Sequence, residues 1–164
     1  MKYDICHIKP NDKGLIKKIG ETLSFLKKDY PDFYNWYNDK IVNGVDKGSR
    51  HIFVATPMNN SNIIAGVLIL KDEREEKKIC TLYVMENHRG KGIGVAFIDC
   101  AINVLKTNKP MITISEHNKE LFNPLLSKYN FKENKEYPDY YRKGVSEFAY
   151  NGYLHEFSSV LQAI

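Results

Sequence analysis

Cysteine is scarce in this chain of 164 residues, which contains three: Cys6, Cys80 and Cys100. They are far apart and lie among apolar neighbours, a pattern that favours reduced, buried thiols over a disulfide framework. No two of them form a C-x-x-C pair, and the five histidines form no H-x-x-x-H pair. Because metal sites draw on ligands at such short spacings, we expect no metal centre.

Long hydrophobic runs and an excess of one charge are also lacking. The longest apolar stretches, such as residues 63–70, hold eight residues, whereas a helix that crosses a bilayer needs about 20. The N-terminus lacks the pattern of a secretory signal. The net charge is +4 with both signs interspersed, unlike the basic stripe of a nucleic-acid-binding protein. We therefore expect a cytoplasmic protein that binds neither membranes nor nucleic acids.

The composition, 43% hydrophobic and 27% charged, is typical of a soluble globular protein. We predict a single domain over residues 1–164, with a core over about 1–150 and a C-terminal helical extension over 153–164. This extension carries apolar residues at helical spacing: Leu154, Phe157, Leu161 and Ile164. The apolar stripe either packs on its own domain or contacts a second subunit, and we favour a homodimer.

Hydrophobic periodicity predicts an α/β chain in which helices and strands mix. Apolar residues at steps of three and four indicate helices over residues 13–28, 33–44, 93–105 and 118–129. Alternating or β-branched runs indicate strands over residues 3–8, 50–55, 63–71, 78–85, 111–115, 131–137 and 145–150.

Three glycines at alternate positions lie between a predicted strand and a predicted helix: Gly90, Gly92 and Gly94. Without side chains they let a ligand approach the backbone. The free N–H groups and the positive end of the helix dipole face that ligand. Arg89 and Lys91 add positive charge, so a diphosphate group is the natural occupant.

Other glycine motifs that bind phosphates do not fit this loop. Phe97 stands where G-x-G-x-x-G requires its third glycine, and no G-x-x-x-x-G-K-[ST] is present. Dinucleotide and P-loop sites are therefore excluded. Taken alone, the loop also fits a tight strand-to-helix turn with solvated basic residues.

The segment from Leu82 to Gly94 reads L-Y-V-M-E-N-H-R-G-K-G-I-G. It resembles the signature of the GNAT superfamily of acyl-CoA-dependent N-acetyltransferases, [R/Q]-x-x-G-x-[G/A] after an L-Y-V-like strand, and Arg89, Gly92 and Gly94 match its fixed places. The order of predicted elements over residues 1–150 also agrees. The resemblance implies the GNAT fold, a mixed, mostly antiparallel central sheet of about seven strands with about four helices, here followed by the short C-terminal helix.

The resemblance also implies acetyl-CoA as the cofactor. In the family, the strand before the loop splays from the next strand, and the pantetheine arm lies in the gap like an added strand. The backbone N–H of Val84 would stabilise the oxyanion that forms when an amine attacks the thioester. The implied coenzyme-binding residues are Leu82, Tyr83, Val84, Arg89, Gly90, Lys91, Gly92, Ile93, Gly94, Asn118 and Leu126.

One family feature is missing from this chain. Members carry a tyrosine in a pattern like L-Y-x-K-x-G-F, whose hydroxyl protonates the departing thiolate. The alignment places Leu126 at the tyrosine and Asn130 at the glycine. Ser127, Tyr129 or water then remains as the acid, and a thiolate is already a tolerable leaving group. Tyr129 also fits a plain core aromatic, and we favour that interpretation.

The general base is equally open. By alternation, Lys78, Cys80 and Leu82 share one face of their strand, and none of them is a carboxylate. Glu116 and His117 follow the splayed strand and are better placed. Each of them also fits an ordinary loop or helix-start position.

The resemblance places the acceptor pocket between the first two helices and the loop that joins the last two strands. The substrate-binding candidates there are Phe33, Trp36, Tyr37, Tyr140, Tyr141 and Arg142. Such aromatic residues can bind an apolar or cationic acceptor. Phe33, Trp36 and Tyr37 fit a buried helix face equally well.

The sequence thus predicts an N-acetyltransferase that moves the acetyl group of acetyl-CoA to a primary amine of a small molecule or peptide, by direct attack on the thioester. Leu126 leaves an alternative open, a CoA-binding sensor or interaction module with weak or lost catalysis.

Overall fold

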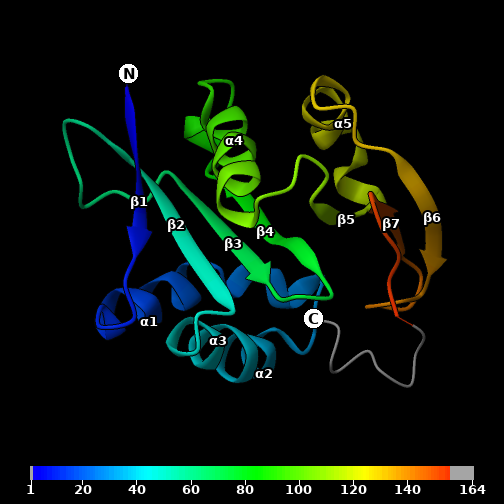
Figure 1. Cartoon of the computed structure of the whole chain (residues 1–164), viewed down its shortest axis with the longest axis horizontal. Helices are drawn as coiled ribbons and strands as arrows, with labels where there is room; N and C mark the ends of the chain where they lie inside the picture. Colours follow the sequence, from blue (N-terminus) through cyan, green and yellow to red (C-terminus); the bar gives the residue numbers. More distant parts are fainter. Residues whose placement is uncertain (1, 156–164) are drawn as a thin grey trace.

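A computed structural model describes residues 2–155 of the chain and contains one seven-stranded sheet (Figure 1). The strands are β1 (Tyr3–Ile8), β2 (Arg50–Pro57), β3 (Gly66–Asp72), β4 (Lys77–Val84), β5 (Met111–Ser115), β6 (Glu133–Pro138) and β7 (Ser146–Tyr150). Their order across the sheet is β1-β2-β3-β4-β5-β7-β6. All neighbours are antiparallel except β4 and β5. The predicted mixed, mostly antiparallel sheet is confirmed.

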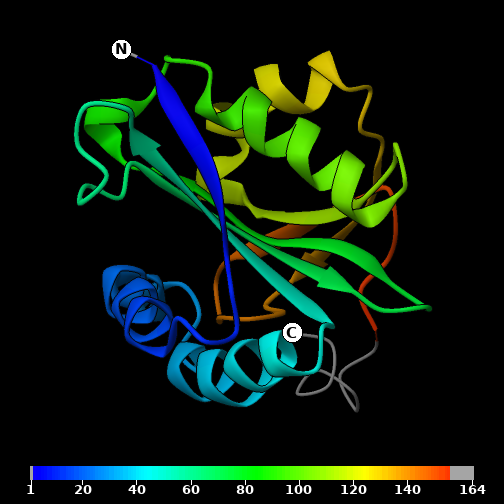
Figure 2. The ribbon, with the colours of Figure 1, turned by 60° about the vertical axis from the view of Figure 1, so that its left-hand side comes forward.

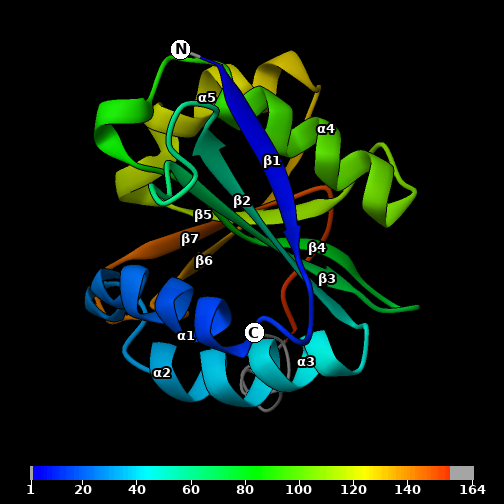
Figure 3. The same cartoon turned by 90° about the vertical axis from the view of Figure 1, so that its left-hand side faces the viewer.

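In the part of the chain that the structure describes, four helical segments cover the sheet. They are α1 (Lys13–Thr22) with the 3₁₀ helix η1 (Ser24–Lys28); a continuous run of α2 (Phe33–Trp36), the π-helical η2 (Tyr37–Val42) and α3 (Asn43–Asp46); α4 (Ile93–Leu105); and α5 (Lys119–Lys128). Two short 3₁₀ turns, η3 (Glu86–His88) and η4 (Glu116–Asn118), precede α4 and α5. Figure 3 shows α1 to α3 on one face of the sheet and α4 and α5 on the other.

Because helices cover both faces, the central strands are buried on both sides and read as continuous apolar runs. Val67 and Ile69 of β3 pack with α1 to α3, and Leu68 and Leu70 pack with α4 and α5. This explains why residues 63–71 show no alternation of polar and apolar side chains. The regular strand begins only at Gly66, because residues 63–65 form the end of the preceding loop.

β4 and β5 separate soon after they meet. Their parallel pairing is limited to Lys78 with Met111 and Ile79 with Ile112. Beyond these two pairs the rest of β4 remains bonded to β3, while β5 continues beside β7. The sheet therefore opens at its centre, between two strands that are each held firmly from the other side.

A β-bulge changes the phase of β4. Thr81 pairs with Ile69 and Ile79 with Leu70, which leaves Cys80 as an extra residue. Cys80 packs with the α1 to α3 core, whereas Leu82 packs with the α4 and α5 core. The prediction that Lys78, Cys80 and Leu82 share one face is therefore wrong, because it assumed an unbroken alternation.

The prediction of buried thiols is also wrong for Cys6, which is exposed, while Cys80 and Cys100 are half-buried. Cys6 lies on β1, which forms one margin of the sheet (blue in Figure 2). A strand at the margin keeps part of its surface in solvent. The apolar neighbours of Cys6 in sequence did not indicate its environment.

The predicted C-terminal helix lies outside the described residues from residue 156 onward. Residues 153–155 form no regular secondary structure. Leu154 is buried with Met111, Tyr140 and Ala149, so the first member of the apolar stripe contacts its own chain. The homodimer stays a prediction. Within the described part of the chain, no helix is long and apolar enough to cross a membrane.

Candidate active site

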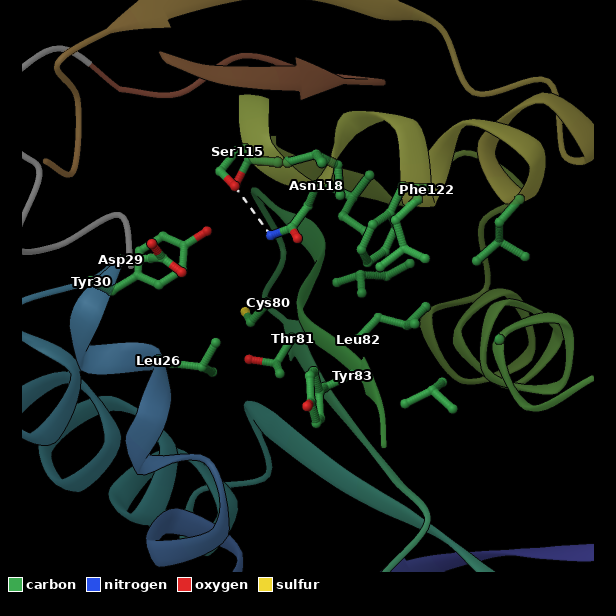
Figure 4. Close-up of a pocket in the computed structure, with 18 of the residues that line it drawn as sticks. Leu26, Asp29, Tyr30, Cys80, Thr81, Leu82, Tyr83, Ser115, Asn118 and Phe122 are labelled. Carbon is green, nitrogen blue, oxygen red and sulfur yellow. Dashed lines mark hydrogen bonds between the residues drawn. The ribbon is translucent and has the colours of Figure 1, made fainter. Parts of the chain in front are cut away.

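The opening between β4 and β5 forms a cavity of about 860 Å³. Both strands contribute to its wall, Lys78 to Val84 from β4 and Ile112 to Ser115 from β5. Figure 4 shows Cys80 to Tyr83 at its centre, Asp29 and Tyr30 on the left, and Ser115, Asn118 and Phe122 along the top. Residues from both faces of the sheet therefore meet in one cavity.

The glycine loop lies at the edge of this cavity and begins α4. Gly90 and Gly92 have φ of 70° and 86°, a left-handed conformation that favours glycine. An added Cβ at either position would meet no atom within 4 Å. Among residues 2–155, the N–H groups of residues 90–95 have no backbone acceptor. The loop thus presents bare backbone donors, together with the helix dipole, to the cavity.

The basic side chains of the loop are held against the backbone. Arg89 donates its Nε–H to the carbonyl of Val84 at 3.1 Å. Lys91 donates from Nζ to the carbonyl of Asn87 at 2.7 Å. Both side chains are exposed, and of the two only Arg89 lines the cavity.

The backbone of β4 offers polar groups to the gap. Met85 donates its N–H to the carbonyl of Ala65 at 2.9 Å. Because successive N–H groups of a strand point to opposite edges, the N–H of Val84 points away from β3 and toward the gap. The side chains of Leu82, Tyr83 and Val84 line the same cavity.

The opposite wall comes from α5 and the turn before it. Asn118 donates from Nδ2 to Ser115 Oγ at 3.1 Å, the dashed line in Figure 4. The next turns of the helix face the cavity with Leu121, Phe122 and Leu125. Leu126 is instead buried in the core between α4 and the sheet, with 3% of its surface exposed. The cavity wall formed by residues 121–125 contains no phenol.

The three side chains predicted as acid or base lie outside this wall. Glu116 accepts the N–H of Ser146 at 3.1 Å and so joins η4 to β7. His117 is exposed. Tyr129 donates to the carboxylate of Asp99 at 2.6 Å and lies 3.2 Å from the carbonyl of Val95, both on α4.

The predicted acceptor residues divide into two groups. Phe33, Trp36, Tyr140 and Tyr141 line the cavity, as does Ile93 from the coenzyme side. Tyr37 is buried, and its hydroxyl donates to the carbonyl of Ile16 at 2.6 Å. Arg142 binds Asp29 at 3.1 Å and the carbonyl of Lys28 at 2.7 Å, which links the β6–β7 loop to η1.

Glu147 was missed by the sequence analysis. It lies on β7 opposite Ser115, with 3% of its surface exposed, and Tyr30 donates a hydrogen bond to it at 3.4 Å. Burial raises the pKa of Glu147 to about 7, against the opposing effects of a hydrogen bond with Thr113 and the charge of Lys78. The alternation of side chains along β7 places Glu147 on the same face of the sheet as Ala149. The sequence alone does not show that this face is buried, because that depends on the order of the strands in the sheet.

Comparisons with known proteins agree with this geometry. The family model described as the acetyltransferase (GNAT) family matches residues 16–121. The match includes β4, the glycine loop, all of α4 and the first turn of α5. A comparison with curated protein sequences finds no significant relative.

Solved structures resemble the whole described fold. NAA60 of Arabidopsis thaliana in complex with acetyl-CoA is 14% identical with a TM-score of 0.64, covering 91% of this chain and 97% of its own. The PaiA N-acetyltransferase of Thermoplasma acidophilum in complex with coenzyme A is 16% identical with a TM-score of 0.62, covering 93% and 100%. The spermidine N-acetyltransferase of Vibrio cholerae is 12% identical with a TM-score of 0.60, covering 90% and 91%. At these identities the similarity concerns the fold.

Proposed function

The chain belongs to the GNAT acetyltransferase family, and on this premise we propose that it transfers the acetyl group of acetyl-CoA to the primary amine of a small molecule or peptide. The observation that carries the proposal is the cavity between β4 and β5. It brings the bare donors of the glycine loop together with the inward-facing backbone of β4. The coenzymes named in the NAA60 and PaiA structures support this reading.

The residues present fit coenzyme A. The space beside Gly90 and Gly92 admits a pyrophosphate close to the N–H groups of residues 90–95. Leu82 and Val84 offer backbone groups to a pantetheine arm, and Asn118 offers a side-chain amide. Lys91, Tyr83, Arg89, Ile93 and Gly94 belong to the same proposed site, whereas Leu126 supports it from the core.

When bound, acetyl-CoA supplies an activated thioester carbon that the amine attacks directly. The N–H of Val84 would donate to the thioester oxygen as negative charge develops there, and a donor of this kind contributes about 10²-fold or more. Aromatic side chains, including Phe33 and Trp36, would hold the acceptor and exclude water. Residues 121–125 offer no phenol to the cavity, and we assign protonation of the departing thiolate to solvent.

Thiol release tests the proposal. Acetyl-CoA is incubated with the protein and with spermidine, 2-phenylethylamine, a lysine-bearing peptide or a peptide with a free N-terminus. We expect thiol release, read with a thiol reagent, that matches acetylated amine by mass. The N-acetylated form of each amine is the control. Release no faster than hydrolysis with every amine would contradict the proposal.

The apolar wall of α5 favours a second candidate, a CoA-binding module without turnover. Calorimetric titration with acetyl-CoA, combined with the thiol-release assay, separates the two candidates. Both predict binding, and only the first predicts thiol release.

A further inference from the structure

A buried carboxyl group lies beneath the acceptor side of the cavity. Glu147 lies on β7, and its side chain is on the same face of the sheet as those of Thr113 and Ser115 on the neighbouring strand β5. Strand interiors rarely hold a carboxyl group, because removing it from water without a strong partner destabilises the fold. No Lys or Arg among residues 2–155 forms a salt bridge with Glu147. The buried carboxyl therefore destabilises the fold, and ionisable groups in such environments are common at functional sites.

Three hydroxyl-bearing side chains that line the cavity are neighbours of this carboxyl. Tyr30, Thr113 and Tyr141 all line the cavity, whereas Glu147 is not among its lining residues. The Tyr30 hydroxyl donates to Glu147 Oε1 at 3.4 Å. Thr113 is close enough to Glu147 and Tyr141 to lower the pKa of each through hydrogen bonding. Figure 4 shows Tyr30, in the loop between η1 and α2, with its side chain directed toward β4 and β5.

We propose that Glu147 accepts the proton of the acceptor amine through the Tyr30 hydroxyl. The inference rests on the proposed function. The bound ammonium gives one N–H proton to the Tyr30 oxygen while Tyr30 passes its own proton to Glu147 Oε1, which frees the nitrogen lone pair. The neutral amine then attacks the acetyl carbon and the C–S bond breaks. The nitrogen releases a second proton to solvent, and the thiolate gains a proton from solvent. The carboxyl returns its proton to water before the next turnover.

The charged groups around Glu147 suit this role. Lys78 on β4 is 4% exposed and favours the carboxylate, while Asp29 next to η1 disfavours it. Asp29 is itself paired with Arg142. Tyr141 faces Glu147 from the β6–β7 loop, and burial raises its pKa far above the ordinary value, so that it stays neutral. The carboxyl therefore titrates near neutral pH, where a proton acceptor is most useful.

The test uses Glu147→Gln and Tyr30→Phe, with Glu136→Gln as the matched control. Glu136 is an exposed glutamate on the neighbouring strand β6. Two nucleophiles are compared at saturating acetyl-CoA: the fastest primary amine of the panel, which is cationic at pH 7, and hydroxylamine, which is already neutral. Titration calorimetry with acetyl-CoA reports the integrity of the coenzyme site.

We expect kcat for the amine to fall by about 10²-fold in both variants, with a much smaller loss for hydroxylamine. The rise of kcat through about pH 7 should disappear in Glu147→Gln. The acetyl-CoA affinity of both variants should equal that of the original protein. The control Glu136→Gln should have the same kcat as the original protein.

Equal losses with both nucleophiles would overturn the inference and indicate a structural role. A rise in KM without a fall in kcat would overturn it in favour of ammonium binding, and unchanged kinetics would also overturn it. In these cases the original enzyme is active and the proposed function stands. An original protein inactive with every nucleophile would overturn both.

Discussion

The most informative single residues at this site are those that lack a side chain. Gly90 and Gly92 hold a left-handed backbone next to open space, so that donors of residues 90–95 stay accessible. Gly94 differs, because it lies inside α4 and an added Cβ would contact Leu125 at 3.4 Å. The three glycines of the motif therefore have different roles. Gly90 and Gly92 shape the loop, whereas Gly94 allows the close packing of α4 against Leu125.

Substitution of Gly92 tests the loop. Gly92→Ala should lower the free energy of unfolding by about 1 kcal/mol, because a left-handed residue with a Cβ is strained. It should also weaken acetyl-CoA binding by about tenfold, since the new methyl group occupies the approach to the backbone. Urea unfolding and titration calorimetry measure the two effects.

Gly14→Ala is the matched control, because Gly14 lies in α1 with no atom within 4 Å of an added Cβ. This change should stabilise the protein by about 0.5 kcal/mol and leave binding unchanged. Normal acetyl-CoA affinity in Gly92→Ala would contradict the assignment of the loop.

The buried carboxyl predicts an unusual dependence of stability on pH. Burial raises the pKa of Glu147 to about 7, from an ordinary value of 4.5. Between these pH values the folded protein keeps a proton that the unfolded chain releases, so stability falls as pH rises and levels off above pH 7. The fall from this group reaches about 3 kcal/mol.

In Glu147→Gln this decrease of stability with rising pH should be absent, because glutamine does not titrate. Its unfolding free energy, relative to the original protein, should therefore increase between pH 5 and pH 8. Urea unfolding at both values measures the change, with Glu136→Gln as the reference for a surface carboxyl. An identical pH slope in the original protein and Glu147→Gln would show that the carboxyl titrates normally.

Tyr129 was a candidate acid, and its surroundings argue for a structural role. Burial and the hydrogen bond to Asp99 raise its pKa to about 12, too high for efficient proton donation near neutral pH. Tyr129→Phe should reduce stability by about 1 kcal/mol, the value of a typical hydrogen bond. It should leave kcat within about twofold of the original. A loss of kcat beyond tenfold at unchanged KM would instead identify Tyr129 as the acid.

At the scale of elements, β4 shows which features the sequence predicts and which it does not. Periodicity predicted the strand and the helices and strands next to it in sequence, and the resemblance to the family implied the gap between β4 and β5. The bulge at Cys80 has no marker in the sequence, because it arises from the register between β3 and β4. Glu147 could not be identified as buried without knowing that β7 lies between β5 and β6. Local patterns predict elements, whereas pairing decides which side chains reach the site.

The β6–β7 loop is tied to η1 by Arg142, which binds Asp29 and the carbonyl of Lys28. Arg142→Ala should remove the link between the β6–β7 loop and η1 at this side of the acceptor pocket. We expect KM for the amine to rise by about threefold to tenfold while acetyl-CoA affinity is unchanged. Stability should change by less than about 1 kcal/mol, because the ion pair is partly exposed.

Lys143→Ala is the control for Arg142, since Lys143 is an exposed cation in the same loop. Steady-state kinetics with varied amine and fixed acetyl-CoA compare the two variants. An equal rise of KM in both would show that net charge, rather than the link to η1, affects acceptor binding.

At the scale of the whole molecule, the sheet separates two layers of helices and is open at one place. The glycine loop and α5 reach that opening from one face, and η1 with α2 reaches it from the other. We propose that acetyl-CoA occupies the first side and the amine the second, so that the two substrates meet between β4 and β5. Neither could meet the other through an intact sheet.

A crystal structure of the protein with acetyl-CoA tests this account most directly. We predict a pyrophosphate within hydrogen-bond distance of N–H groups of residues 90–95. The pantetheine arm should lie between β4 and β5, with the thioester oxygen within about 3 Å of the Val84 nitrogen. The acetyl group should then face Tyr30. Acetyl-CoA bound elsewhere, or with its thioester remote from Val84, would contradict the account.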